Sequence, residues 1–226
     1  MKKITIVFVI LVIALSGFLL ITNLKFLKNR ITGLAELSTS AIILQLSEAA
    51  CEADFVSGWN LISIPCVPTP TNISEVLLNI LPDIISVHEY YGIGADPWKA
   101  YNPSLPGWVV QDLTKLDRKK GYWMNMAANT HYYYNSSTAT PNILSLANGW
   151  NLVGYPLISL KNISDAMLPI NGSYDIIVLY NATDSADYWK EYTWNESRPS
   201  GQDLYNMTPY YGYWIYSYGS RTLMLD

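Results

Sequence analysis

The ionisable and nucleophilic side chains of this sequence do not combine into a catalytic pattern. His88 and His131 are the only histidines, and neither has a second ligand residue at metal-site spacing. No Ser-His-Asp set, Cys-His pair or glycine-rich phosphate loop is present, and Glu89 and Asp96 form no recognisable acid–base pair. Residues 184–187 offer two aspartates to Ca²⁺ but lack the EF-hand pattern. We therefore expect no enzyme activity, no bound metal and no cofactor.

Cys51 and Cys66 are the only cysteines. In an oxidising compartment, two cysteines this close, on either side of a predicted turn, favour a disulfide, and two unrelated thiols are the alternative. The bond would close a loop of about 15 residues, for which the chain-entropy model gives about 3 kcal/mol of stabilisation.

Asparagine-linked glycosylation is the modification that the sequence predicts. Chance would give roughly two or three Asn-X-Ser/Thr sequons. The chain has seven, and a bias toward Asn and Ser in loops explains part of the excess. They are Asn72, Asn135, Asn162, Asn171, Asn181, Asn195 and Asn206. Helix capping is an alternative role for Asn72 and Asn162. Asn206 is the weakest acceptor because Thr208-Pro209 follows it.

Aromatic side chains are the remaining candidates for ligand binding. The chain has 18 Tyr and 8 Trp but only 4 Phe, and rings with a polar group suit half-wet surfaces as well as cores. Aromatic residues outside the repeated motifs described below are expected to be the exposed ones. The candidates for stacking against sugars are therefore Trp108, Trp194, Tyr133 and Tyr211. The alternative is that these rings fill small β cores or subunit interfaces.

The chain contains an internal repeat. The motif at 58–65 returns at 149–156, an offset of 149 − 58 = 91 residues. Three later landmarks keep this offset, and they begin at Ala95, Gln111 and Gly121. A fixed offset over four landmarks predicts a tandem duplication. We expect one β-rich module at 51–135 and a second at 141–226, separated by a Ser/Thr/Pro linker.

The same elements are predicted in both modules. Each module should open with a β-hairpin whose turn holds Ser57-Gly58 or Asn148-Gly149. The second copy is the clearer one, because Asn-Gly between apolar runs is a strong hairpin signal. A short helix follows, with Asn72 or Asn162 at its start. The remaining segments alternate as antiparallel strands. They are expected at 84–91, 98–101, 121–126 and 131–134, with counterparts about 91 residues later.

A membrane anchor is predicted at the N-terminus. An apolar run at 4–22 follows Lys2 and Lys3, and about 19 residues suffice to cross a ~30 Å hydrocarbon core. Apolar residues at three- and four-residue steps continue from 24 to 44, which predicts a helical stalk, so that residues 1–50 form the anchor and stalk. A cleaved signal peptide is the alternative. The fold class is thus predicted as α+β, with a long transmembrane helix before two mainly antiparallel modules.

Charge limits the choice of partner and location. Only 14% of residues are charged, the net charge is −4, and the basic residues after position 30 cluster only at 115–120. Nucleic-acid binding is therefore not expected. Positive charges are balanced on the two sides of the apolar run, so the sequons decide the topology. They predict a single-pass protein of the cell membrane whose C-terminal part is extracellular.

The repeated motifs resemble a repeat of extracellular archaeal and bacterial proteins, including proteins associated with surface layers. The matching residues are 58–65, Trp98 and Tyr101, 112–113 and 121–123, with their partners in the second module. The glycine that usually stands two residues before the last motif is replaced by Lys119 and Tyr210. The resemblance implies a β-rich surface module, and it carries no catalytic residues.

These observations predict a membrane-anchored cell-envelope glycoprotein with a structural or adhesive role, which contacts itself or other envelope proteins. A pilin-like filament subunit assembled through the N-terminal helix is one alternative. A carbohydrate-binding surface module is another.

Overall fold

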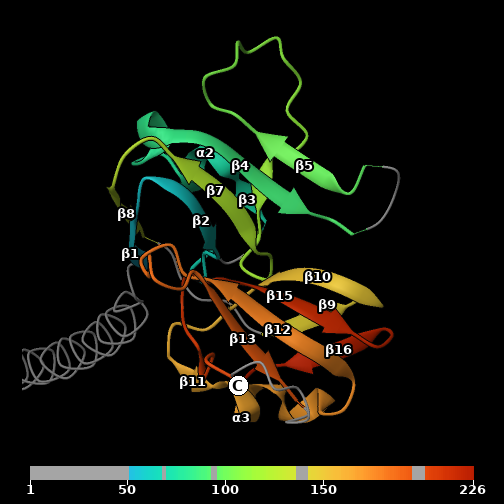
Figure 1. The fold of residues 1–226 in the computed structure, drawn as a ribbon. Helices are drawn as coiled ribbons and strands as arrows, with labels where there is room; N and C mark the ends of the chain where they lie inside the picture. The colour runs from blue at the N-terminus through green and yellow to red at the C-terminus, as the bar shows by residue number, and fades with distance from the viewer. Residues whose placement is uncertain (1–50, 68–69, 93–95, 136–141, 195–201) are drawn as a thin grey trace, which may run out of the picture. The chain divides into compact units, whose positions relative to one another are not determined.

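The structure is a computed structural model that describes residues 51–67, 70–92, 96–135, 142–194 and 202–226. Strands dominate these residues, and the helices α2 (Ile73–Val76) and α3 (Ile163–Met167) have only four and five residues (Figure 1). The predicted α+β class with a long transmembrane helix is therefore wrong. The described fold is mainly β, and none of its helices is long and apolar enough to cross a membrane. The predicted anchor and stalk at 1–50 lie outside the described residues.

Residues Glu48–Asp226 form one compact unit, in which the same order of elements occurs twice. The first module, 51–135, is blue to green in Figure 1, and the second, 142–226, is yellow to red. The first contains β1 (Cys51–Phe55), β2 (Gly58–Ile62), β3 (Thr71–Asn72), α2, the 3-10 helix η1 (Leu81–Asp83), β4 (Ile84–Tyr90), β5 (Trp98–Tyr101), β6 (Lys115–Leu116), β7 (Tyr122–Met126) and β8 (Thr130–Tyr134). The second contains β9 (Ile143–Leu146), β10 (Gly149–Gly154), β11 (Lys161–Asn162), α3, η2 (Leu168–Ile170), β12 (Tyr174–Tyr180), β13 (Trp189–Thr193), β14 (Asn206–Met207), β15 (Gly212–Ser217) and β16 (Arg221–Met224).

Each module is built on a four-stranded antiparallel sheet. The strand order is β2-β7-β4-β5 in the first module and β10-β15-β12-β13 in the second. Two short antiparallel pairs accompany each sheet, β1 with β8 and β3 with β6, then β9 with β16 and β11 with β14. The third and sixth strands of each module were not predicted, because two residues are too few to show a periodic pattern.

The predicted opening hairpin is not formed in either module. β1 pairs with β8 and β2 pairs with β7, so β1 and β2 are successive parts of one bent ribbon. The register changes by one residue where the ribbon bends, from Phe55 opposite Thr130 to Gly58 opposite Met126. Gly58 has φ +91° and Gly149 has φ +93°, which glycine adopts at little steric cost. The glycine therefore serves a bulge in the ribbon instead of a hairpin turn.

The asparagine that follows this glycine stabilises the bend. The Asn60 amide donates to the carbonyls of Val56 and Gly58 at 2.7 and 3.0 Å, and its oxygen accepts from the Val56 N–H at 3.1 Å. Asn151 makes the same three contacts, with Ala147 and Gly149. These bonds satisfy backbone groups that the bent ladder leaves unpaired.

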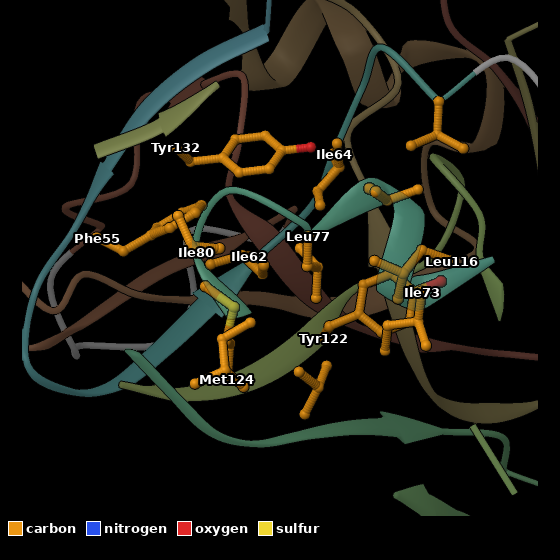
Figure 2. Packing of buried hydrophobic residues seen from close by; sticks show 14 of the residues in the cluster. Phe55, Ile62, Ile64, Ile73, Leu77, Ile80, Leu116, Tyr122, Met124 and Tyr132 are labelled. Atoms are coloured by element: carbon orange, nitrogen blue, oxygen red, sulfur yellow. The ribbon is translucent and has the colours of Figure 1, made fainter. Parts of the chain in front are cut away.

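The two short helices begin as predicted, and each module has a buried core. Asn72 and Asn162 cap α2 and α3 by accepting from the N–H groups of Ser74 and Ser164, each at 2.9 Å. In the first module, Ile64, Leu77 and other buried side chains converge with Tyr122 (Figure 2). A matching core in the second module lies around Tyr213.

The buried tyrosine hydroxyls close a turn in each module. The Tyr122 hydroxyl accepts from the Asp117 N–H at 2.7 Å, and the Tyr213 hydroxyl accepts from the Thr208 N–H at the same distance. Both tyrosines have no exposed surface. Burial raises the pKa of both phenols, so these hydroxyls stay neutral and keep their hydrogen bonds.

Cys51 and Cys66 form the predicted disulfide, and both are completely buried. The bond ties the start of β1 to the segment after β2. Asn142 and Leu157 stand 91 residues later, so the second module has the same sheet without the bond.

The two modules meet through backbone contacts that obey an approximate two-fold symmetry. Ile62 forms an antiparallel bridge with Tyr211, and Lys120 forms one with Val153. The symmetry brings Gly121 and Gly212 close together, since a Cβ added to Gly212 would lie 3.3 Å from the Gly121 Cα and 2.8 Å from the Ile62 carbonyl oxygen. The glycine of the last repeated motif is thus required by the packing between modules.

Candidate aromatic binding surface

Strand alternation places the repeated tryptophans on the sheet face that points away from the core. In β7, Tyr122, Met124 and Met126 are buried, whereas Trp123 and Asn125 between them are half-buried. Successive side chains of a strand point to opposite faces, so Trp123 shares the outer face of the sheet with Asn125. The same alternation places Trp214 on the outer face of the second sheet.

Eight rings lie on these outer faces, and we call them the aromatic face. They are Trp59, Tyr90, Trp98, Trp123, Trp150, Tyr180, Trp189 and Trp214. Four of them are well exposed, Trp59 at 44%, Trp98 at 38%, Trp150 at 43% and Trp189 at 47%. Six of the eight tryptophans of the chain therefore belong to one surface, which no described segment covers.

Ring contacts link the aromatic faces of the two sheets. Trp214 of the second module touches Tyr90 and Trp98 of the first, with centroids 5.0 and 6.2 Å apart. By symmetry, Trp123 touches Tyr180 and Trp189 at 5.1 and 6.0 Å. Most of these pairs are tilted or edge-to-face, which are favourable arrangements for aromatic rings. Because the rings pack against one another, the aromatic face is already formed in the absence of a ligand.

Two open pockets lie between the rings, and they are related by the approximate two-fold symmetry. One, of about 370 Å³, is lined by Tyr90, Trp150, Val178, Trp189 and Trp214. The other, of about 450 Å³, is lined by Trp59, His88, Trp98, Trp123, Tyr180 and Trp189. Both are mostly apolar, and His88 is the only side chain in either lining that titrates near neutral pH.

His88 distinguishes the two pockets. It lies opposite Trp123 on the neighbouring strand, and in the second module Val178 lies opposite Trp214. Val178 is therefore the structural counterpart of His88, although the repeat offset of 91 residues leads to Leu179. The His88 ring lies 5.6 Å from Trp59, and its Nε2 is 3.0 Å from the Ser86 hydroxyl. Burial lowers the pKa of His88, with Asp112 opposing the shift, so the ring is neutral at pH 7.

A more polar groove begins beside the aromatic face. Two cavities of about 280 and 660 Å³ share Tyr91, Lys120, Ser145, Ala147 and Asn151, and we call them together the junction groove. The first cavity also borders Tyr90 and Trp150, so the groove continues from the aromatic face. Its walls come from both modules.

Two ammonium groups lie close to the ring of Tyr91, which lines the groove. The Nζ atoms of Lys99 and Lys120 lie 4.8 and 5.1 Å from the Tyr91 ring centre, within cation–π range. Lys120 also lies 3.5 Å from the buried carboxylate of Glu89. Burial raises the pKa of Glu89, and Lys120 opposes that shift.

The four residues predicted to stack against sugars are scattered. Trp108 is 83% exposed in the loop after β5, Trp194 is 40% exposed after β13, and Tyr133 is 43% exposed in β8. Tyr211 is half-buried, and its hydroxyl is 3.4 Å from the Asn181 side-chain oxygen. In the described residues no ring contact joins any two of the four.

The exposed tryptophans that do gather come from the repeated motifs, although the sequence predicts exposure for the aromatic residues outside those motifs. A signal for them was present. In β7 and β15 a tryptophan alternates with buried residues, so a large apolar ring occupies the face that is polar in a solvated sheet.

The sequons occupy several environments. Asn135 and Asn171 are exposed, as are the helix caps Asn72 and Asn162, whereas Asn181 and Asn206 are half-buried. The Asn181 oxygen accepts from the N–H and hydroxyl of Thr183 at 3.1 and 2.8 Å. Asn195 lies outside the described residues. Glycosylation at all seven stays a prediction.

The aspartates considered as Ca²⁺ ligands bind a lysine instead. Lys190 Nζ lies 3.0 Å from carboxylate oxygens of both Asp184 and Asp187, and 3.4 Å from Asp203. These contacts lower the pKa of Asp184 and Asp187. The ammonium group thus occupies the position that a cation would take. Among the residues that the structure describes, no group of three or more His, Cys, Asp or Glu is placed to hold a metal.

No family model matches this chain, and no curated protein or solved structure shows significant similarity to it. The aromatic face and the junction groove are therefore the features of this chain that bear on its function.

Proposed function

We propose that this chain is an outward-facing cell-envelope protein that acts by adhesion, and that the aromatic face is its binding surface. The observation that carries the proposal is the concentration of six tryptophans and two tyrosines on one uncovered surface. Contiguous exposed apolar surface marks interaction sites, and Trp and Tyr are the residues most enriched among binding hot spots.

The location outside the cell has separate support. The Cys51–Cys66 bond belongs to an oxidising compartment, where disulfides form and persist. The seven sequons and the resemblance of the repeated motifs to extracellular proteins favour the same side of the membrane. Attachment through the apolar run at 4–22 is part of the proposal and rests on the sequence.

Adhesion by this surface is tested with the full chain purified in detergent and isolated cell envelopes. Trp98 and Trp189 lie on edge strands, and changing either to Ala removes a half-exposed ring without opening the core. We expect each of Trp98→Ala and Trp189→Ala to weaken retention on envelopes about tenfold, because loss of a hot-spot ring costs roughly 1–2 kcal/mol.

Trp108→Ala is the matched control, because Trp108 is the most exposed tryptophan and lies outside the aromatic face. It should leave envelope binding unchanged. Equal binding by all three variants and the parent chain would refute adhesion through the aromatic face.

A further inference from the structure

The junction groove is positively charged in an acidic protein. Lys119, Lys120 and Arg221 line it, and Lys99 reaches the same Tyr91 ring as Lys120. These are four of the eight Lys and Arg residues in the described part of the chain. Glu89 and Asp117 are the acids beside them, so the site keeps about two positive charges while the whole chain carries −4.

The scaffold does not require this charge, because the symmetry-related groove lacks it. That cavity, of about 270 Å³, is lined by Asn181, Tyr210 and Tyr211 where the junction groove has Tyr91, Lys119 and Lys120. The backbone bridges Ile62–Tyr211 and Lys120–Val153 are equivalent, so both grooves have the same frame. Lys119 therefore marks a difference in binding, whereas Lys120 also partners the buried Glu89 of its own module.

The groove also joins charge to aromatic rings. Tyr90 and Trp150 line both the smaller cavity of the groove and a pocket of the aromatic face. A ligand seated there would place an apolar ring face on the indole and direct an anionic group toward the lysines. Ser145 and Asn148 line the same cavity and carry a hydroxyl and an amide for further hydrogen bonds.

We propose that the junction groove binds acidic sugar residues of an anionic glycan. The pyranose ring of a hexuronate stacks on Trp150 and Tyr90, and its carboxylate lies near the ammonium groups of Lys119 and Lys120. Opposite charge, together with apolar rings beside polar groups, provides the two features that such a ligand needs. This inference rests on the proposed adhesion and names the class of ligand.

The test compares two forms of one sugar chain. Hexagalacturonate and its fully methyl-esterified form have the same rings, and only the first carries carboxylates. Binding to the full chain in detergent is followed by tryptophan fluorescence and calorimetry. We expect the acid to bind about tenfold more tightly than the ester at low ionic strength, with the difference shrinking as salt screens the charges.

Variants assign the charge effect to the groove. Lys119→Gln should weaken binding of the acid severalfold and leave binding of the ester unchanged, whereas Trp150→Ala should weaken both. Lys115→Gln is the matched control, since Lys115 is exposed on β6 and outside the groove lining. Lys120 is left intact because it partners the buried Glu89.

Equal affinity for acid and ester would overturn the inference, and so would an effect of Lys119→Gln no larger than that of Lys115→Gln. Either result leaves the adhesion proposal standing if Trp98→Ala still weakens envelope binding. Failure of adhesion itself would appear as envelope binding that is insensitive to Trp98 and Trp189.

Discussion

Where the two modules meet, the same backbone position has different surroundings. Ser63 of the first module is fully buried, and its hydroxyl donates to the Tyr211 carbonyl at 2.9 Å. Gly154 is its counterpart, and a Cβ there would lie 2.5 Å from the carbonyl oxygens of both Arg118 and Lys120. The two-fold symmetry is therefore approximate, and the two modules are not interchangeable at this position.

The positions shared by both modules have a different character. Gly58 and Gly149 bend the ribbon, and Asn60 and Asn151 satisfy the backbone at that bend. These glycines and asparagines, which the backbone requires, are kept in both copies. The two cysteines and the adjacent Lys119 and Lys120 occur in the first copy only. The shared backbone frame thus supports two dissimilar surfaces.

Exchanging the junction residues should give the largest effect. Gly154→Ser installs the residue of the first module, and we expect a loss of about 3 kcal/mol or more of unfolding free energy, because backbone oxygens cannot yield to the new Cβ. The reverse change, Ser63→Gly, should cost only about 1–2 kcal/mol through lost hydrogen bonds and added backbone freedom.

Urea unfolding followed by tryptophan fluorescence measures both changes. Gly107→Ser is the control, because nothing lies within 4 Å of a Cβ at that position. A Gly154→Ser variant as stable as the Gly107→Ser control would contradict the close packing at the junction.

Removing the disulfide tests whether the first module, like the second, can fold stably without a covalent cross-link. The double change Cys51→Ala and Cys66→Ala opens a loop with a sequence separation of 15 residues, and we expect a loss of about 3 kcal/mol. Reduced parent protein, unfolded in the same denaturant series, separates loss of the bond from loss of side-chain packing. If the unfolding free energy falls by less than about 1 kcal/mol, the first module depends on its disulfide no more than the second module depends on a cross-link that it lacks.

The smallest expected effect concerns His88, which Val178 replaces in the second module. Burial lowers the pKa of folded His88 below the unfolded value, so the stability contributed by its neutral form is present above that unfolded value. It is lost as the pH falls through the lowered folded pKa. His88→Val should therefore reduce the fall in Tm between pH 7.5 and 5, and only slightly, because the ring is only partly buried.

Melting curves at several pH values give the comparison, with His131→Gln as a second histidine variant on an exposed position. If His88→Val and parent protein lose stability in parallel on acidification, His88 does not titrate differently in the folded state.

The local patterns that the sequence showed correctly are those with a local physical cause. Asn72 caps α2 because its side chain reaches an N–H two residues away, and strand β4 is a run of seven residues rich in β-branched and aromatic side chains. The close spacing of Cys51 and Cys66 pointed to their disulfide for a similar reason. The hairpin at Gly58 was wrongly predicted because a glycine with positive φ serves a bulge as well as a turn.

The sequence alone established the repeat, the strand-rich modules and the candidate disulfide, since each depends on residue type and short spacing. Tertiary structure decided which strands pair, that Trp98 and Trp214 from different modules touch, and that Lys99 and Lys120 share the Tyr91 ring. These contacts join residues far apart in the chain, and their geometry depends on how the two sheets pack. The aromatic face and the junction groove therefore form only when the two sheets pack together.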